Sequence, residues 1–291
     1  MLKFHINHNN LFKLIDELSK ISLISNNNIK FFNKILLHNN IKINDAYHIL
    51  GNRIGIIERI NFQNKQQLNF TNKYITDHTS DMITNIIPGN NSNSCIMILS
   101  ILYMKIVWKM SFLNIKDKKF FNNNGIKKKV HMMRQQNICN YCSTVDFQII
   151  EIPCENNLVF GILLPNKKKN KVIYDPTLYF DQFILTNLVI RMPKFTCHDK
   201  MSLKHFLIQN DITEIFNKDK SNFTNLSIDK NLFVSDIIQE CVLIVNEIGS
   251  LSYVNVKSRK IEKKIIVNHA FQYYVKNSNG LLLLSGICDN L

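Results

Sequence analysis

The cysteines and histidines are the residues of this sequence whose types and spacing could support chemistry. Cys139 and Cys142 are separated by two residues, which is the spacing of a metal clip or of a redox pair. No second pair with this spacing follows, because Cys197 and His198 are adjacent rather than spaced for one metal. We therefore expect no metal site and no cofactor.

The sequence also gives no set of residues that defines an enzyme active site. A Cys/His nucleophile pair could assemble in space from scattered histidines, but the sequence alone nominates none of them. The phosphate-binding loop, HExxH and GxSxG motifs are absent. The seven cysteines are an odd number without framework spacing, which indicates free thiols in a reducing compartment. We expect no catalytic residue and a protein that is not an enzyme.

A long basic segment near the C-terminus is the stronger candidate for function. Residues 245–271 join two strongly apolar segments and contain a cluster of Lys and Arg but no Pro. Connections between strands are usually a few residues long, and longer ones are commonly functional or disordered. The question is what this segment does and which elements hold it.

Strands are predicted on both sides of the segment and through most of the second half of the chain. The segment is preceded by the apolar stretch CVLIVNE and followed by a hairpin that turns at Asn277–Gly280. Apolar runs and alternation predict further strands at residues 95–104, 147–153, 158–165 and 232–247.

Helices are predicted mainly in the first third of the chain. Apolar residues at helical spacing predict a helix over residues 11–21, and similar patterns predict helices over 43–60 and 71–87. Helices followed by strands favour an α+β fold rather than alternating βαβ units. No linker or internal repeat divides the sequence, so we expect a single domain over residues 1–291.

Composition limits the partners of the chain. The 291 residues are 45% hydrophobic and 10% aromatic, which is enough for a packed core. The net charge of +14 permits binding to polyanions, but the lysine clusters at 127–129 and 166–171 are not interleaved with aromatic residues. We therefore expect a solvated basic surface and no nucleic-acid partner. The longest apolar run, residues 95–104, is too short to cross a bilayer, so we expect no membrane span.

With these segments placed, the chain resembles the serpin family of serine protease inhibitors, and among serpins it is most similar to the divergent poxvirus members. The resemblance rests on ordered matches from Thr71 to Ile287. The matching segments are TNKYITDHTSDMI, CIMILSILYMKIVW with Trp108, VHMMRQQNICNY with Met132, Met133 and Gln135, QIIEIPC with GILLP, MPKF, LFVSDIIQECVLIVNEIGS, and HAFQYYVKNSNGLLLLSGI. The resemblance implies a large central sheet with further mixed sheets and surrounding helices.

The resemblance implies that residues 249–267 form a reactive centre loop, which is exposed as bait for a protease. In inhibitory members, cleavage lets this loop insert as a new strand of the main sheet. Because strand side chains alternate, one row of the loop would then be buried and the other would face water. The hinge and buried row implied here are Glu247, Gly249, Ser250, Ser252, Val254 and Val256.

The position of the bait bond stays open in the sequence. Counting from the hinge places the residue before the cut at Lys263, and counting back from Phe271 places it at Arg259. Lys260 and Lys264 are also basic, so either count indicates a trypsin-like host serine protease, whose pocket holds a carboxylate.

The resemblance begins late, so we expect an N-terminally truncated serpin without the first three helices of the family. One of these helices normally covers the underside of the strand that holds Ile96, Ile98 and Leu102. Its absence predicts an exposed sheet and a partner that covers it.

Two functions remain open. One is a working inhibitor, and the other is a non-inhibitory serpin-fold binding protein or decaying gene product. We favour a viral homologue with impaired inhibition that modulates host defence, an immune-evasion role in the host cytoplasm. Secretion is the alternative location if the true N-terminus is missing.

Overall fold

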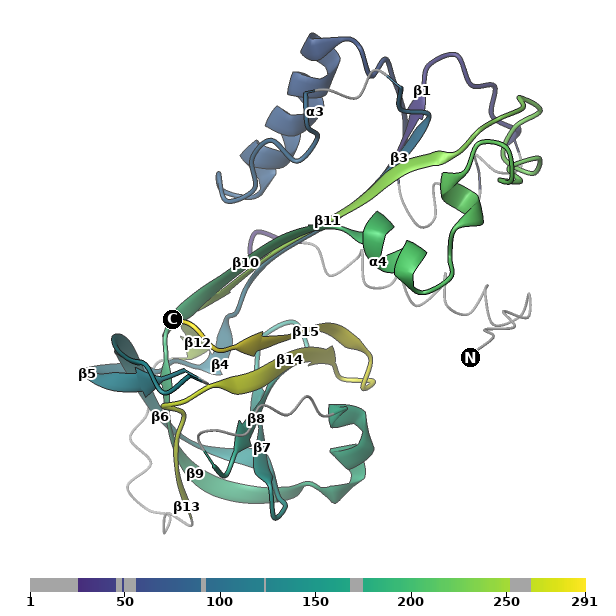
Figure 1. Ribbon diagram of the computed structural model, residues 1–291. Helices are drawn as coiled ribbons and strands as arrows, with labels where there is room; N and C mark the ends of the chain where they lie inside the picture. The colour runs from purple at the N-terminus through teal and green to yellow at the C-terminus, as the bar shows by residue number, and fades with distance from the viewer. Residues whose placement is uncertain are drawn as a thin grey trace. The chain divides into compact units, whose positions relative to one another are not determined.

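The computed structural model describes residues 26–45, 49, 56–89, 93–122, 124–167, 175–251 and 263–291 (Figure 1). The chain divides into two compact units. The first unit contains Met1–Met104 and His198–Leu243, and the second contains Lys105–Cys197 and Ile244–Leu291. The described elements are mostly strands, in several mixed sheets with few helices, which confirms the α+β class.

The first unit is built on a five-stranded sheet with the order β10, β11, β3, β1, β2. β1 runs antiparallel to β3 and parallel to β2. β3 and β11 are hydrogen-bonded neighbours and lie side by side in Figure 1. The strands of this sheet are β1 (Ile29–His38), β2 (Ile56–Ile60), β3 (Ile96–Lys105), β10 (Phe195–Ser202) and β11 (Val234–Val245).

One face of this sheet is covered by α3 (Lys65–His78). The rings of Phe32 on β1 and Tyr74 on α3 meet edge to face, with centroids 6.0 Å apart. On β3, four residues of the same face are buried, and only Lys105 at the end of the strand is half-buried. The four buried residues are Met97, Leu99, Ile101 and Tyr103.

Two predicted helices need correction. The helix expected over residues 71–87 is α3, which begins at Lys65 because the Asn64 side chain accepts hydrogen bonds from two backbone amides of the first turn. It ends at His78, and turns with positive φ at Ser80 and Asp81 follow. The helix expected over 43–60 is wrong at Ile56–Ile60, which forms β2 by pairing with β1. The helix expected over 11–21 lies outside the described residues.

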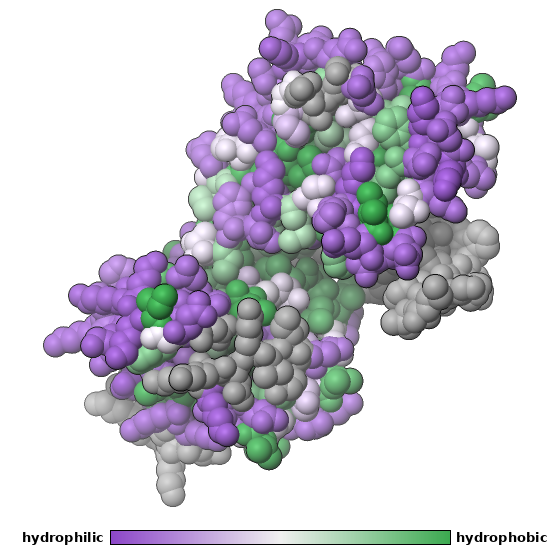
Figure 2. Space-filling model, in the orientation of Figure 1, coloured by the Kyte–Doolittle hydropathy of each residue, from purple (hydrophilic) through white to green (hydrophobic). Residues whose placement is uncertain are grey.

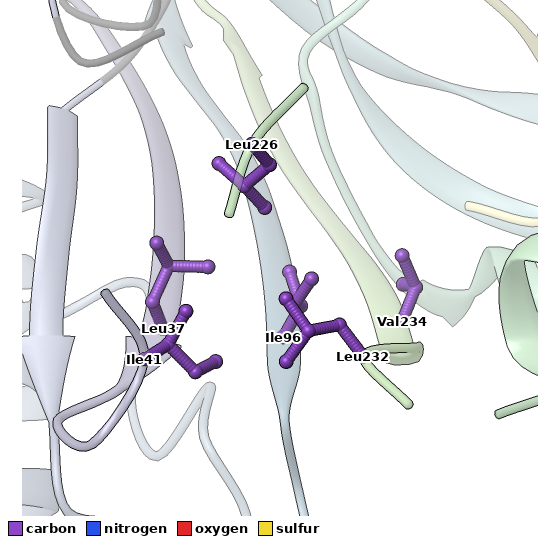
Figure 3. Close-up of a cluster of buried hydrophobic side chains, with 6 residues drawn as sticks. All are labelled: Leu37, Ile41, Ile96, Leu226, Leu232 and Val234. Atoms are coloured by element: carbon purple, nitrogen blue, oxygen red, sulfur yellow. The ribbon is translucent and has the colours of Figure 1, made fainter. Parts of the chain in front are cut away.

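The opposite face of the sheet carries an apolar cluster that includes one end of β3. Figure 3 shows these side chains gathered around Ile96, which is 2% exposed. Ile98 and Leu102 are half-buried, so these three residues form no large exposed patch, and the covering partner stays a prediction. The cluster consists of Leu37, Ile41, Ile96, Leu226, Leu232 and Val234.

Two short helical segments complete the described elements of the first unit, α4 (Leu203–Gln209) and the 3-10 helix η2 (Glu214–Phe216). In the view of Figure 2, hydrophilic residues cover most of the described surface of each unit, and hydrophobic residues form small separate patches.

The second unit contains an eight-stranded sheet in which β13, β9, β6, β7, β8, β14 and β15 follow one another and β5 pairs with β6. A separate two-stranded sheet joins β4 (Trp108–Met110) to β12 (Gly249–Leu251), and the 3-10 helix η1 spans Pro176–Gln182. The strands of the larger sheet are β5 (Leu113–Phe121), β6 (Lys127–Ser143), β7 (Phe147–Pro153), β8 (Leu158–Pro165), β9 (Ile184–Pro193), β13 (Lys263–Ile266), β14 (Phe271–Asn277) and β15 (Leu282–Cys288).

The strand predictions are confirmed by β3, β7, β8, β11 and the C-terminal hairpin of β14 and β15. The hairpin turns at the expected Asn277–Gly280, where Gly280 has a φ of 84° and donates its N–H to the Asn277 carbonyl at 3.1 Å. Glycine adopts this left-handed backbone without steric cost, which explains why the chain turns there.

Candidate functional site

The start of the basic segment is held against β4. After β11 ends at Val245, the chain forms β12, which runs parallel to β4 with Gly249 opposite Trp108 and Leu251 opposite Met110. Three backbone amides of the β4 chain donate to carbonyls of the segment: Trp108 to Ile248 at 3.0 Å, Ser111 to Leu251 at 2.9 Å and Phe112 to Glu247 at 2.9 Å. We call this set of contacts the β12–β4 clasp.

Trp108 fixes the backbone immediately before the hinge. Its side chain is fully buried, and its indole Nε1 donates a hydrogen bond of 2.6 Å to the carbonyl of Asn246. The rings of Phe112 and Phe160 lie against the indole, with centroids 5.0 and 5.4 Å away. The direction in which the segment leaves β11 is therefore set by a packed aromatic group.

Gly249 is required by a close backbone approach. A Cβ atom at this position would lie 2.4 Å from the backbone nitrogen of Ser111 and 2.8 Å from the carbonyl carbon of Met110. Both neighbours are backbone atoms, so no side-chain movement could make room. Only glycine lets β12 pair this closely with the β4 chain.

Glu247 forms an ion pair that ties the hinge to the end of β9. Lys194 Nζ lies 2.7 Å from Glu247 Oε2, and the Asn114 side-chain amide donates to Glu247 Oε1 at 3.2 Å. The hydrogen bond from Lys194 is the main reason that the pKa of Glu247 lies below its ordinary value. The carboxylate is therefore charged at neutral pH and joins three parts of the chain.

Ser250 is exposed as a residue, but its hydroxyl is held by a neighbouring turn. Ser250 Oγ donates to Glu155 Oε1 at 2.5 Å and also lies 3.2 Å from the Lys109 carbonyl. The next residue, Leu251, is 66% exposed. Ser250, the first residue of the row that insertion would bury, is therefore bound to the protein surface in this structure. Leu251, the first large residue of the hinge, faces water.

The basic candidates at the far end of the segment belong to a strand. Lys263 and Lys264 begin β13, which runs parallel to β9 with Lys263 opposite Leu188. Lys263 Nζ contacts the Tyr141 hydroxyl and lies 4.6 Å from the centroid of that ring. The other predicted loop residues lie outside the described part of the chain: Ser252, Val254, Val256, Arg259 and Lys260.

The sequence did not identify three residues that hold the hinge. Lys194 lies within the MPKF match, so the sequence identified its motif. The sequence did not predict that Lys194 pairs with Glu247. Asn114 and Glu155 gave no signal, because Glu155 is 95 positions from Ser250 and only the fold brings them together.

The cysteine and histidine candidates occupy structural positions. Cys139 and Cys142 are three positions apart on β6, so their side chains point to opposite faces of the strand. Burial raises the pKa of the Cys139 thiol to about 12. His198 Nε2 lies 2.7 Å from Glu240 Oε1, a buried carboxylate on β11. Among the described residues, no three metal-binding side chains are grouped to hold one ion.

No helix formed by the described residues is both long enough and apolar enough to cross a bilayer.

Comparisons with known proteins agree on one family. A family model described as serpin (serine protease inhibitor) matches residues 2–290. An uncharacterised serpin-like protein of Acanthamoeba polyphaga mimivirus is 28% identical over 302 residues, which cover 94% of this chain and 75% of that protein. Human neuroserpin is 24% identical over 288 residues, 89% of this chain and 70% of neuroserpin. The solved structure of maspin, 19% identical, has a TM-score of 0.86 over 97% of this chain and 83% of maspin, which is a likeness of fold alone.

Proposed function

This chain belongs to the serpin family, and on that premise we propose that it presents its basic segment as bait to a trypsin-like serine protease but traps that protease inefficiently. The family consists of protease inhibitors rather than enzymes, so the expected chemistry is that of a cleaved bait. The observation that carries the proposal is the anchoring of the segment at both ends, by β12 and by β13.

The anchoring favours one pair of bait candidates over the other. A protease active site takes up extended substrate residues on both sides of the cut, which a strand already paired within a sheet does not offer. Lys263 and Lys264 are paired with β9, whereas Arg259 and Lys260 lie in the stretch between the two anchors. We therefore place the bait bond after Arg259 or Lys260.

Inefficient trapping follows from what insertion must overcome. The new strand would have to enter between β3 and β11, which are hydrogen-bonded to each other. The segment would also have to leave the β12–β4 clasp, and Leu251 and Tyr253 are large residues at the hinge. The prospective buried row from Ser250 to Val256 carries no charge, so insertion is permitted but slow.

Incubation with trypsin tests the proposal. We expect cleavage after Arg259 or Lys260, mostly as free cut protein and with a minor protease complex that resists SDS. The double variant Arg259→Ala/Lys260→Ala should lose the cut at these positions and the complex that forms from it, whereas Lys264→Ala should keep both. Cleavage confined to Lys263 or Lys264 would refute the placement of the bait, and complete conversion to complex would refute inefficient trapping.

A binding protein that never traps its protease is the second candidate, favoured by the two large hinge residues. It predicts that cutting the segment leaves the melting temperature of the protein unchanged, because no strand is inserted. A rise in melting temperature after cutting would exclude it.

We also propose a viral origin and a role in modulating host defence within the host cytoplasm, with secretion as the alternative. The mimivirus relative supports the viral origin, and the kinship with poxvirus serpins stays a prediction.

A further inference from the structure

We infer that Glu155 is a latch that holds Ser250 in β12 and thereby slows entry of the cut segment into the main sheet. Glu155 would be a positioning residue, since it acts on the hinge and touches neither the protease nor the bait bond. The inference rests on the proposed function, in which the cut segment inserts.

Glu155 lies in a turn whose backbone hydrogen bonds do not involve the hinge residues. Glu155 lies between β7 and β8, where its N–H donates to the Val107 carbonyl at 2.8 Å and its carbonyl accepts from Leu158 at 3.2 Å. These contacts are made by the backbone, so they leave the carboxylate to bind Ser250 and survive changes of the Glu155 side chain. Asn156 and Asn157 follow with positive φ, as expected in a tight turn.

The hydrogen bond between the Ser250 hydroxyl and the Glu155 carboxylate belongs to the stronger class of hydrogen bonds. A hydroxyl that donates to a carboxylate forms a shorter and stronger hydrogen bond than one between neutral groups. The distance of 2.5 Å from Ser250 Oγ to Glu155 Oε1 fits this class, and the 3.2 Å contact to the Lys109 carbonyl is weaker. Glu155 is therefore the main acceptor for the Ser250 hydroxyl.

Insertion has to break this contact at its first step. β12 now pairs with β4 in a separate two-stranded sheet, whereas an inserted strand that follows β11 through a short turn would pair within the main sheet. The segment must therefore give up its pairing with β4 before it can pair in the main sheet. Ser250 is the first residue of the row that becomes buried, so its hydroxyl leaves Glu155 before any later residue can enter.

A contact present in the starting state and absent from the transition state slows the transition. We expect loss of the carboxylate acceptor to speed insertion by about fivefold, a modest effect because the site is exposed to water. A glutamine retains an oxygen acceptor without the charge, so its effect should be intermediate.

The experiment compares Glu155→Ala, Glu155→Gln, Ser250→Ala and the double variant Glu155→Ala/Ser250→Ala with the unaltered protein after limited cutting by trypsin. Trp108 is the only tryptophan of the chain and is bonded to the hinge, so its fluorescence can follow insertion, and the melting temperature reports the end point. Cutting is measured on gels, so that the rate of insertion is separated from the rate of cleavage. Asp146→Asn, in the exposed turn between β6 and β7, is the matched control.

The expected order of insertion rates is Glu155→Ala, then Glu155→Gln, then the unaltered protein, which the control should match. The double variant should be no faster than Ser250→Ala, because Glu155 has no hydroxyl to hold once Ser250 is replaced. Equal rates for all proteins, with a normal rise in melting temperature, would overturn the latch and leave the proposed function standing. No rise in melting temperature in any protein would overturn insertion itself, and the latch with it.

Discussion

The indole Nε1 of Trp108 donates a hydrogen bond of 2.6 Å to the carbonyl of Asn246, directly before Glu247. This bond joins the chain of β4 to the backbone that leaves β11. The indole that donates the bond is fully buried, and Asn246 is half-buried. The Trp108 side chain therefore contributes to the geometry of the hinge, together with the β12–β4 clasp and the Glu247 ion pair.

Replacing Trp108 with Phe should destabilise the protein by about 2–4 kcal/mol. The smaller ring leaves part of the space next to Phe112 and Phe160 empty and removes the donor to the Asn246 carbonyl. Urea unfolding followed by circular dichroism measures the change. A loss below about 1 kcal/mol would show that another group can hold the hinge.

Gly249→Ala should cost about 1–3 kcal/mol and loosen β12, because the added Cβ would lie 2.4 Å from the Ser111 nitrogen. Gly89 is the matched control, since a Cβ there would have no atom within 4 Å. Gly89→Ala should therefore be close to neutral. Thermal unfolding compares the two variants, and equal effects would contradict the close approach at Gly249.

The ion pair of Glu247 and Lys194 should stabilise the protein in a pH-dependent way. The pKa of Glu247 is lower in the folded protein than in the unfolded chain, mainly through the hydrogen bond from Lys194. Its contribution is therefore complete above the ordinary glutamate pKa of about 4.3 and is lost as the pH falls through the lower folded value.

Thermal unfolding of Glu247→Gln and the unaltered protein between neutral pH and pH ~3 tests this. The unaltered protein should melt at the higher temperature at neutral pH, and the difference should shrink as the solution is acidified. The carboxylate is partly exposed, so the difference should also fall with added salt. A gap that stays constant across this range would contradict the lowered pKa.

The predictable parts of the fold are those whose signals are local. The hairpin of β14 and β15 combines apolar strands with a glycine at a positive φ, and both features can be read from neighbouring residues. β2 was mistaken for helix because short apolar runs fit either period, and its pairing with β1 decides the outcome. The start of α3 was missed because Leu68 is the only buried residue between Lys65 and Phe70, so no apolar pattern marks the first turns.

In the candidate site too, residues marked by a local sequence motif were predictable, and residues brought in by tertiary packing were not. Glu247, Gly249 and Ser250 were found because their order matches a family motif, and the structure places all three in the β12–β4 clasp or beside it. The acceptor for Ser250 could not be found in this way, because Glu155 follows a different strand and reaches the hinge only through tertiary packing.

A buried ion pair in the second unit gives the last prediction. Glu151 on β7 is almost fully buried, and its Oε1 lies 2.6 Å from Lys276 Nζ. The same oxygen accepts from the Tyr274 hydroxyl at 2.6 Å, and Asn140 donates to Oε2 at 3.1 Å. Burial, with the neighbouring carboxylate, raises the pKa of Tyr274, so its hydroxyl stays protonated and remains a donor.

Replacing Lys276 with Met should cost about 3–5 kcal/mol, because it leaves the Glu151 carboxylate buried without a counter-charge. The double variant Glu151→Gln/Lys276→Met removes both charges and keeps an oxygen that can accept from Tyr274. It should recover most of that loss, since a neutral pair carries no uncompensated charge. Urea unfolding of both variants measures the difference, and a double variant as unstable as Lys276→Met alone would show that lysine packing against Phe180, rather than charge, is what stabilises this part of the sheet.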